Sequence, residues 1–305
     1  MTTSVEEYLS SSKKKRVLYG VDEAFLNAWD DLTSFHGDAE MFVTTHSYIL
    51  FKPEAIVGRN IEKALEFLVA RGFIPVAFVP LRMNSQTVQQ LWRYQLNQAT
   101  PERIRIVNTL VSAADSLFVL LRDKQDGSEL GSVRLRQLKG PSACAKRNPE
   151  QLRYQLGRQS DFLNFVHTPN EPADFVREFG VFFSGAQRLE LLRTASANQS
   201  QLQALLESTA QLYSRFPSHD ISFAGALDRL KENCFQLIES GDPRSDVCEA
   251  IVNCCNQLGV ESDGKHELLF RLIDQADLKI DTWDWITISA QKAGPNLPGV
   301  KPVLD

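Results

Sequence analysis

His167 is the residue of this chain whose position best suits a chemical role. It follows the apolar run 162–166 and precedes the polar segment 168–170, so the pattern predicts that its imidazole projects from the end of a strand. Neutral imidazole is nucleophilic near pH 7 and readily passes on a group that it has accepted. A single histidine at such a place is more often structural than catalytic, so its role depends on the residues that accompany it.

Four chemically suitable residues accompany His167. Asn164 lies three residues before it, and Glu178 lies eleven residues after it. Lys52 ends an earlier apolar run, and Arg153 lies upstream of the histidine. A carboxylate one helix after the strand can accept a hydrogen bond from the ring and fix its tautomer. Fixed cations can hold an anionic group while the nucleophile accepts it. Each cation alone is more often a solvated surface charge, but the spacing to the histidine favours function.

These residues give the segment 46–183 a resemblance to the nucleoside diphosphate kinases. Lys-Pro-Glu at 52–54 is similar to the family's Lys-Pro-Asp, and Asn-Phe-Val-His at 164–167 is similar to its Asn-x-x-His, in which the histidine is phosphorylated. Glu178 lies at the family's distance from that histidine. Arg153 matches the arginine of the family's Thr-(Ile/Leu)-Arg segment, one residue further from the histidine than usual. A Lys-Pro dipeptide alone carries no information, whereas the combination is fairly specific.

The resemblance implies a phosphotransferase with a ping-pong mechanism. ATP or another nucleoside triphosphate, with Mg²⁺ held through its phosphates and not by the protein directly, phosphorylates His167. A nucleoside diphosphate or a related acceptor then takes the phosphoryl group. The implied catalytic residues are His167, Glu178 and Lys52. The implied nucleotide- and phosphate-binding residues are Lys52, Tyr94, Arg134, Arg153 and Asn164.

The match to the family is looser where the base would bind. Tyr94 is the counterpart of the family's tyrosine, but the segment 95–111 contains no phenylalanine to stack on the base. Ile104 or Ile106 would have to cover the base instead. A changed acceptor or a narrowed nucleotide preference is a hypothesis that follows from this difference.

Other departures lie around the phosphate-binding positions. Arg134 matches the family's second arginine with an offset of one residue, and either Lys139 or Ser142 stands near the position of its threonine. Thr-Pro-Asn at 168–170 replaces the family's Gly-Ser-Asp, which leaves open whether the threonine supplies the missing hydroxyl. The loop 140–150 lacks the Lys-Pro-Gly turn that contributes to trimer contacts in hexameric members, so a homo-oligomer is left open.

A second class of function is a regulatory or partner-binding module that keeps the fold and the nucleotide pocket with little or no catalysis. An added helical region and a divergent loop fit this alternative. The joint presence of lysine, arginine, asparagine, histidine and glutamate favours the enzyme, because a module that only binds needs no nucleophile. Neither G-x-x-x-x-G-K-[ST] nor G-x-G-x-x-G occurs in the chain, so the common P-loop and dinucleotide-binding motifs are absent.

The order of the predicted elements gives the fold class. Apolar runs at 47–51, 73–81, 116–121 and 162–166 predict strands, and helical periodicity lies between and after them. A turn is expected at 126–127. The order is that of an α+β, ferredoxin-like sandwich, with four antiparallel strands backed by helices.

Three parts are predicted along the chain. Residues 1–45 form an N-terminal extension, in which Phe25 and Trp29 mark a short helix that packs on the next unit. Residues 46–183 form the nucleoside diphosphate kinase-like domain. Residues 184–305 form an all-α helical bundle with an irregular C-terminal tail, because apolar residues recur there at helical steps and prolines follow.

Details of the helical part concern its packing. Gly259 is placed to end one helix. Trp283 and Trp285 alternate with acidic residues, which is compatible with a contact point but favours the edge of a core. Three cysteines in a helical stripe are predicted to be core thiols and not zinc ligands: Cys248, Cys254 and Cys255.

Charge and hydropathy limit the expected partners and compartment. Residues 184–305 hold 11 basic and 17 acidic side chains, and the preceding residues hold 22 and 21, so no basic excess is available to wrap a nucleic acid. No apolar run approaches the roughly 18 residues of a membrane helix, and the chain opens with polar residues, so we expect a cytoplasmic protein without a membrane segment. Nucleotides are the expected partners. A protein partner bound through the acidic helical region is left open.

Overall fold

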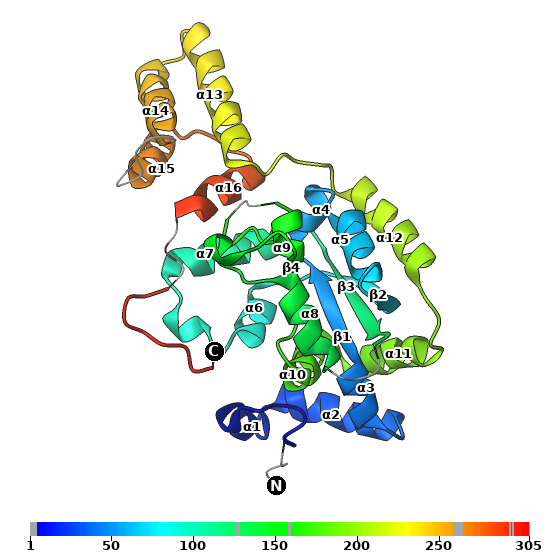
Figure 1. Cartoon of the computed structure of the whole chain (residues 1–305). Coiled ribbons are helices and arrows are strands. Elements are labelled where there is room, and N and C mark those ends of the chain that lie inside the picture. Colours follow the sequence, from blue (N-terminus) through cyan, green and yellow to red (C-terminus); the bar gives the residue numbers. More distant parts are fainter. Residues whose placement is uncertain are drawn as a thin grey trace.

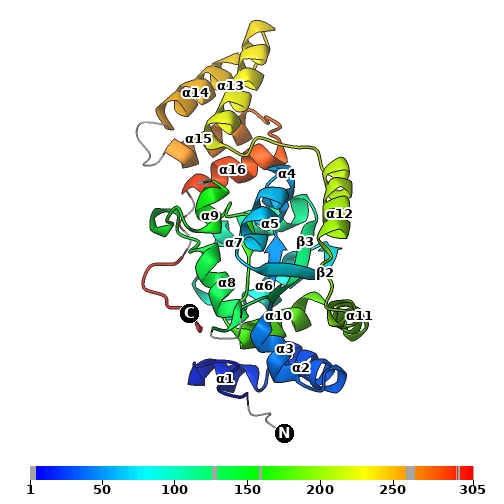
Figure 2. The ribbon, with the colours of Figure 1, turned by 45° about the vertical axis from the view of Figure 1, so that its right-hand side comes forward.

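The centre of the molecule is a four-stranded antiparallel sheet in the order β2-β3-β1-β4. The computed structural model describes residues 5–125, 129–157, 160–258, 265–292, 294 and 296–304. The strands are β1 (His46–Phe51), β2 (Phe73–Leu81), β3 (Ser116–Asp123) and β4 (Val166–His167). Helices cover the sheet on both sides (Figure 1, Figure 2). The predicted ferredoxin-like sandwich is therefore confirmed.

The helices fall into three groups along the chain. Those before the sheet are α1 (Lys13–Tyr19), α2 (Glu23–Phe35) and α3 (Ala39–Thr45). Those between and directly after the strands are α4 (Pro53–Val57), α5 (Ile61–Val69), α6 (Ser85–Leu91), α7 (Pro101–Ala113), α8 (Gly131–Lys139), α9 (Leu152–Gln155) and α10 (Pro172–Phe182), with the short 3₁₀ helices η1 (Leu96–Gln98) and η2 (Cys144–Lys146). Those that follow are α11 (Gly185–Ser196), α12 (Leu202–Arg215), α13 (Phe223–Glu239), α14 (Ser245–Leu258), α15 (Lys265–Gln275) and α16 (Thr282–Lys292).

The central strand β1 explains why both faces of the sheet are covered. All six of its residues are buried. Tyr48 and Leu50 belong to a core shared with α2 and α10, whereas Ile49 and Phe51 belong to the opposite core, shared with α5 and α12. Because successive side chains of a strand point to opposite faces, both faces of β1 need an apolar cover.

Two strand predictions meet different outcomes. The strand at 73–81 is confirmed, and Pro75 is tolerated because β2 is an edge strand with a register shift between Pro75 and Ala77. The strand predicted at 162–166 is wrong in extent, because only Val166 of that run enters β4. Phe165 has a φ of +66°, which breaks the extended conformation just before the strand. The turn predicted at 126–127 lies outside the described residues.

The N-terminal segment is integrated into the sheet domain. Helix α2 packs along α10, and its residues Phe25 and Leu32 are fully buried in the same core as Tyr48. This confirms the predicted N-terminal helix and its packing on the next unit. Helices α11 and α12 also contribute to the two cores of the sheet domain.

A separate helical core is formed by α13, α14, α15 and α16. In Figure 1, α13, α14 and α15 project away from the sheet, and α16 lies between them and α7. The predicted core thiols Cys248, Cys254 and Cys255 are buried and unoxidised there. Trp283 and Trp285 pack at the edge of a small apolar cluster with α7, as the favoured alternative predicts.

Two further sequence expectations concern the ends of elements and the membrane. The helix end predicted at Gly259 lies outside the described residues, and α14 is described as far as Leu258. None of the described helices combines the length and the apolar character that crossing a membrane requires.

Candidate active site

His167 and Glu178 form the centre of the candidate site. The imidazole Nε2 lies 3.0 Å from Oε2 of Glu178, and the buried hydroxyl of Tyr48 donates to the same oxygen. Burial raises the pKa of Glu178, while the adjacent His167 and the hydrogen bonds from His167 and Tyr48 lower it, and the net shift is downward. With the carboxylate as acceptor, the ring proton is held on Nε2, and the lone pair is left on Nδ1.

Strand pairing and one helix bring these three side chains together. His167 pairs with Leu50 of β1, so Tyr48, two residues earlier, points to the same face of the sheet. Helix α10 begins at Pro172, a position where the missing proline N–H costs no helical hydrogen bond. Its packing over this face of the sheet places Glu178 beside the ring.

The second ring nitrogen, Nδ1, differs from Nε2 in its contacts. Nδ1 of His167 has no hydrogen-bond partner within the part of the chain that the structure describes. The ring of Trp92 meets the imidazole nearly edge-on, with centroids 5.9 Å apart and an interplanar angle of 86°. The His167 side chain remains 17% exposed, so the ring is oriented by its neighbours without being enclosed.

Lys52 braces the loop that aims the histidine. Just before His167, Phe165 adopts its left-handed conformation, which is uncommon for a residue with a side chain. Its N–H donates to Oε1 of Glu54 at 3.0 Å, and its carbonyl accepts from the backbone N–H of Lys52 at 2.9 Å. The Lys52 ammonium lies 2.7 Å from Glu54 and donates to the carbonyl of Phe162 at 3.0 Å. Burial lowers the pKa of Lys52. The predicted phosphate ligand is therefore engaged in an internal ion pair.

Arg153, Asn164 and Lys139 lie along the open edge of β4. Arg153 donates to the carbonyl of Val166 at 2.6 Å and to Oδ1 of Asn164 at 3.1 Å. Lys139 donates to the carbonyl of Thr168 at 3.3 Å. Burial lowers the pKa of Arg153 to about 9 and the pKa of Lys139 well below its usual value. The backbone on either side of the histidine thus faces two buried basic groups.

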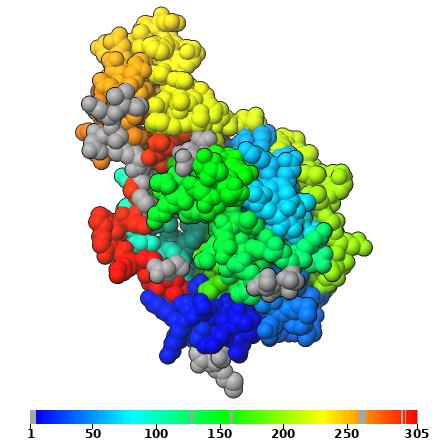
Figure 3. All heavy atoms as spheres, viewed as in Figure 1, coloured from blue at the N-terminus to red at the C-terminus, as the bar shows by residue number. Residues whose placement is uncertain are grey.

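A cavity of about 340 Å³ opens beside these basic groups. Arg136, Lys139 and Arg153 line it, together with Ser142, whose hydroxyl accepts from Arg153 at 3.1 Å. No carboxylate of the described residues is among its lining groups. The space-filling view shows a different hollow, between green atoms on one side and red C-terminal atoms on the other (Figure 3); no described residue of the C-terminal tail is among those that line the 340 Å³ cavity. Three basic side chains without a carboxylate favour an anionic ligand such as a phosphate.

Arg134 is not brought to this cavity. Its guanidinium forms two hydrogen bonds of 2.6 Å with the carboxylate of Asp123 and donates to the carbonyl of Arg71 at 2.9 Å. Asp123 follows the residue that pairs with His46 at the start of β1, whereas His167 pairs near the end of β1. Four residues of strand separate these positions, or about 13 Å. The arginine of α8 that lines the cavity is Arg136, two positions later.

Tyr94 lies on the hairpin between α6 and α7 but does not face the histidine. Its hydroxyl donates to Asp22 at 2.9 Å, and its carbonyl accepts from the backbone N–H groups of Val303 at 2.8 Å and Leu304 at 3.1 Å. The N-terminal segment and the C-terminal tail therefore meet at this residue. Of the two isoleucines considered for the base, Ile106 is buried and Ile104 is exposed.

Sequence reasoning missed Tyr48, Trp92 and Arg136 as site residues. The alternation of β1 contained the signal for Tyr48, because a buried tyrosine hydroxyl needs an acceptor on its own face of the sheet. Tyr48 supplies the hydroxyl that donates to Glu178. Thr168, the residue considered from the sequence as a source of the missing hydroxyl, instead donates to the carbonyl of Pro169. No local pattern indicated that Trp92 would meet the imidazole.

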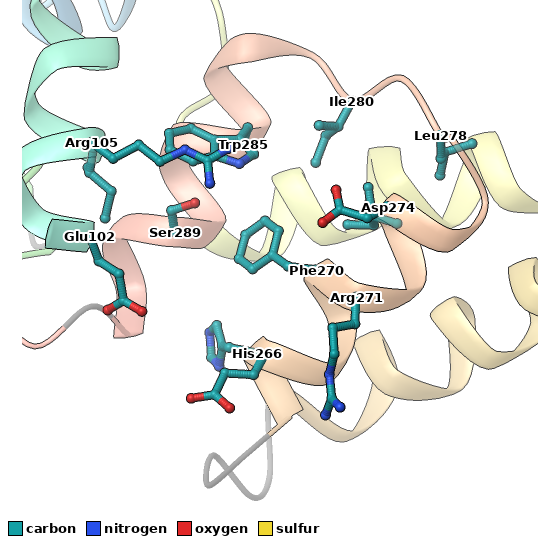
Figure 4. A pocket seen from close by; sticks show the side chains of 13 residues that line it. Glu102, Arg105, His266, Phe270, Arg271, Asp274, Leu278, Ile280, Trp285 and Ser289 are labelled. Atoms are coloured by element: carbon teal, nitrogen blue, oxygen red, sulfur yellow. The ribbon is translucent and has the colours of Figure 1, made fainter.

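A larger cavity, of about 700 Å³, lies away from His167, between α7 and the helices α15 and α16. Figure 4 shows Arg105 beside Trp285, with Phe270 facing them from α15. Its lining mixes acidic, basic and aromatic side chains, so it does not favour one class of ligand. The larger cavity therefore indicates its ligand less clearly than the basic cavity at the edge of β4 does.

A group of potential metal ligands also lies outside the candidate site. His219, Asp281 and Asp284 have ligand atoms within 4.8 Å of one another. Asp284 is already bonded by the guanidinium of Arg229, at 2.6 Å for the shortest contact. The resident arginine cation therefore occupies the place that a metal ion would need.

Comparison with known proteins identifies the segment that contains the candidate site. Residues 45–187 match the family model described as Nucleoside diphosphate kinase, which confirms the resemblance read from the sequence. The comparison with curated proteins gives no match.

Several solved structures are similar to this part of the chain. A nucleoside diphosphate kinase from Aquifex aeolicus is 21% identical, with 47% of this chain and 96% of that chain covered and a TM-score of 0.39. An NDP kinase from Pyrobaculum aerophilum is 14% identical, with 46% and 96% covered and a TM-score of 0.39. A nucleoside-diphosphate kinase from Borrelia burgdorferi with bound vanadate and ADP is 16% identical, with 46% and 86% covered and a TM-score of 0.39.

Proposed function

We propose that the nucleoside diphosphate kinase domain of this chain, residues 45–187, transfers the γ-phosphoryl group of a nucleoside triphosphate through His167 to a nucleoside diphosphate or a related acceptor. One observation carries the proposal. Glu178 holds the Nε2 side of the imidazole and leaves Nδ1 without a partner among the described residues, on a strand whose edge borders a basic cavity.

The first half-reaction follows from this arrangement. The Nδ1 lone pair attacks the γ-phosphorus and forms a nitrogen–phosphorus bond. The bond from the γ-phosphorus to the bridging oxygen breaks, and its electron pair leaves with the nucleoside diphosphate. The imidazole becomes positively charged as it is phosphorylated, and the Glu178 carboxylate stabilises that charge through the Nε2–H bond.

The second half-reaction is the reverse with another acceptor. A terminal phosphate oxygen of the acceptor attacks the phosphorus, the nitrogen–phosphorus bond breaks, and its electron pair returns to Nδ1. Tyr48 and Glu178 keep the same ring nitrogen protonated throughout, so the histidine is regenerated in the tautomer in which it started.

The basic side chains of the cavity would bind the phosphate oxygens. Arg136 is exposed, and Arg153 and Lys139 are held at the edge of β4 by backbone carbonyls and not by carboxylates. Their charges would stabilise the oxygens of the transferring group. Lys52 would act indirectly by bracing Phe165, since its ammonium is paired with Glu54.

The metal ion would arrive with the substrate. The carboxylates near the histidine are engaged, Glu54 with Lys52 and Glu178 with His167. We propose that Mg²⁺ is held by the nucleotide phosphates, where it neutralises part of their charge.

A labelling experiment tests the proposal. The protein is incubated with γ-labelled ATP and Mg²⁺, and a phosphoprotein that is labile in acid and stable in alkali is expected. The His167→Ala variant should acquire no label while it keeps the melting temperature of the parent within a few degrees. Absence of label in the parent protein would overturn the enzyme and leave the nucleotide-binding regulatory module as the better account.

Adding unlabelled nucleoside diphosphates to the labelled protein measures which bases the acceptor site prefers. Between residues 95 and 111 the hairpin has no aromatic side chain that could stack on the base. We therefore expect unequal rates of transfer to the common nucleoside diphosphates. Equal rates with all of them would remove the case for a narrowed preference.

A further inference from the structure

Asp22 is a buried carboxylate of the N-terminal segment, outside the matched kinase domain, and its contacts lead to the candidate site. We propose that Asp22 is a positioning residue for the phosphoryl transfer: through Arg177 it fixes the carboxyl end of α6 and thereby the Trp92 side chain against His167. This inference rests on the proposed function of His167.

The two oxygens of Asp22 have different partners. Oδ1 accepts from the backbone N–H groups of Ala24 at 3.1 Å and Phe25 at 3.4 Å, which caps the start of α2. Oδ2 accepts from Nε of Arg177 at 2.9 Å, from the hydroxyl of Tyr94 at 2.9 Å and, at a longer 3.5 Å, from the half-exposed guanidinium of Arg93. The Asp22 side chain is only 1% exposed, so these bonds are made with little competition from water.

Arg177 carries the contact from Asp22 to α6. Its side chain is also 1% exposed, and its two terminal nitrogens donate to the carbonyls of Leu91 at 3.2 Å and Gln90 at 2.6 Å. Carbonyls in the last turn of a helix have no partner within the helix, so an arginine that binds them holds that helix end in place. Arg177 thus joins α10 to the end of α6, and Asp22 supplies the charge that makes its burial favourable.

The fixed end of α6 borders the reacting histidine. Trp92 directly follows Leu91, and its ring contacts the imidazole of His167. On α10, Arg177 directly precedes Glu178, which bonds the other side of that imidazole. One buried guanidinium is therefore linked to both groups that orient the ring: it bonds the residue before Trp92, and it belongs to the residue before Glu178. The aspartate that pairs with it comes from the N-terminal segment.

The role of Asp22 can be separated from the general attachment of the N-terminal segment. Helix α1 is joined to α10 independently, because Lys15 and Tyr19 bond the carboxylate of Asp174 at 3.0 and 2.7 Å. Loss of the Asp22 charge leaves these bonds in place. The expected consequence is a displaced α6 end and hairpin, with α10 still docked.

Asp31 provides a matched control on the same helix. Its carboxylate accepts from Nε of Arg188 at 2.7 Å, which joins α2 to α11. Among the described residues its carboxylate forms no hydrogen bond or ion pair with α6, Tyr94 or the histidine. Asp31→Asn therefore removes one aspartate–arginine pair of α2 without touching the proposed path.

The experiment compares Asp22→Asn with Asp31→Asn in the full-length chain. We expect Asp22→Asn to lower the single-turnover rate of His167 phosphorylation by ten- to a hundredfold, since a displacement on the order of 1 Å near a reacting group has effects of that size. Asp31→Asn should stay within about twofold of the parent rate. The rate is measured at saturating nucleotide, where it no longer depends on affinity. A lower rate there indicates a misplaced imidazole, whereas a weakened binding site would leave this rate unchanged.

Two further variants keep the test decisive if Asp22→Asn folds poorly. Tyr94→Phe removes one donor to Asp22 and retains the ion pair, and we expect the phosphorylation rate to change by less than threefold. The double variant Asp22→Asn/Arg177→Gln removes both charges and should recover stability but not the rate, because neutral glutamine cannot hold both α6 carbonyls.

The outcomes separate this inference from the proposed function. An unlabelled parent protein would overturn the function of His167. A labelled parent together with Asp22→Asn and Asp31→Asn variants of equal rate would overturn the positioning role of Asp22 alone. Recovery of the full rate in the double variant would also overturn it, since the ion pair would then contribute only to stability.

Discussion

The two ends of the central sheet place basic residues of the same helix, α8, in opposite circumstances. At one end Arg134 is held by both oxygens of Asp123 and stacks over the ring of Phe73, 4.2 Å from its centroid. At the other end Arg136 and Lys139 line a cavity at the edge of the strand that carries His167, and neither forms an ion pair with a carboxylate of the described residues.

The difference distinguishes a structural cation from one that is available to a ligand. A buried guanidinium with a bidentate carboxylate has satisfied both its charge and its donors. A basic group whose partners are a backbone carbonyl and open space lacks a counter-charge, which a phosphate can supply. The comparison moves the predicted second arginine of the site from Arg134 to Arg136.

The largest effects are expected when the two arginines are exchanged for methionine. Arg134→Met should lower the free energy of unfolding by roughly 3–5 kcal/mol, because Asp123 is left buried without its partner. Arg136→Met should leave stability within about 0.5 kcal/mol, since the side chain is exposed. It should lower kcat/KM for the nucleotide about ten- to a hundredfold through the loss of a charged hydrogen bond.

Urea unfolding of both variants measures the difference in stability, and steady-state kinetics measure the difference in kcat/KM. Loss of activity by Arg134→Met at a temperature where it remains folded would contradict a purely structural role of Arg134. Destabilisation of Arg136→Met as strong as that of Arg134→Met would contradict the assignment of Arg136 to the ligand.

Lys139→Met sharpens the comparison, because stability and activity should move in opposite directions. The ammonium is buried and, within the described part of the chain, hydrogen-bonds the carbonyl of Thr168 alone; burial lowers its pKa well below the usual value. Replacement by an apolar side chain of similar length should leave the free energy of unfolding unchanged or raise it by roughly 1 kcal/mol. The phosphorylation rate should fall by about tenfold.

The measurement is again urea unfolding beside single-turnover labelling. A Lys139→Met variant that is destabilised by several kcal/mol would place Lys139 with Arg134 among the structural cations. Lys139→Arg is a useful companion, since it keeps a charge at the same position.

The smallest effect concerns pH. Burial lowers the pKa of Lys139 well below its usual value, so its ammonium loses its proton at a lower pH than an exposed lysine does. The affinity for phosphate should then fall, and kcat/KM should decline by a few-fold as the pH rises into the alkaline range. The decline should persist in Arg136→Met and disappear in Lys139→Met, which can be read from the pH profiles of the three proteins. A profile of the parent that stays flat to pH 10 would contradict it.

The same folded-state shift has a consequence for stability. A base whose pKa is lower in the folded than in the unfolded chain gives up its proton more readily when folded, so its burial opposes folding while it is charged. For Lys139 this cost is fully present below its folded-state pKa and decreases as the pH rises toward the pKa of an unfolded lysine. Bound phosphate would offset it, and nucleotide should therefore raise the melting temperature more at pH 7.5 than at pH 10.

Much of the fold was readable from the sequence because its elements are locally consistent. The apolar run at 47–51 predicted the strand β1, and the helical periodicity after 162–166 predicted the helix α10, whose Phe175 and Phe179 are buried against the sheet. The shortened β4 was not readable, because the left-handed conformation of Phe165 is imposed by its bonds to Glu54 and Lys52. Neither partner lies near Phe165 in the chain.

The sequence by itself determined which side chains could react: the spacing from Asn164 through His167 to Glu178 places an imidazole and a carboxylate one helix apart on a recognisable domain. Only the tertiary structure decided which basic residues line a cavity at the edge of the histidine's strand, which are already paired, and that Asp22 lies beside the helix that carries Glu178. The physical reason is that local periodicity specifies the face of an element, whereas charge neutralisation depends on groups that are distant in the chain and close in space.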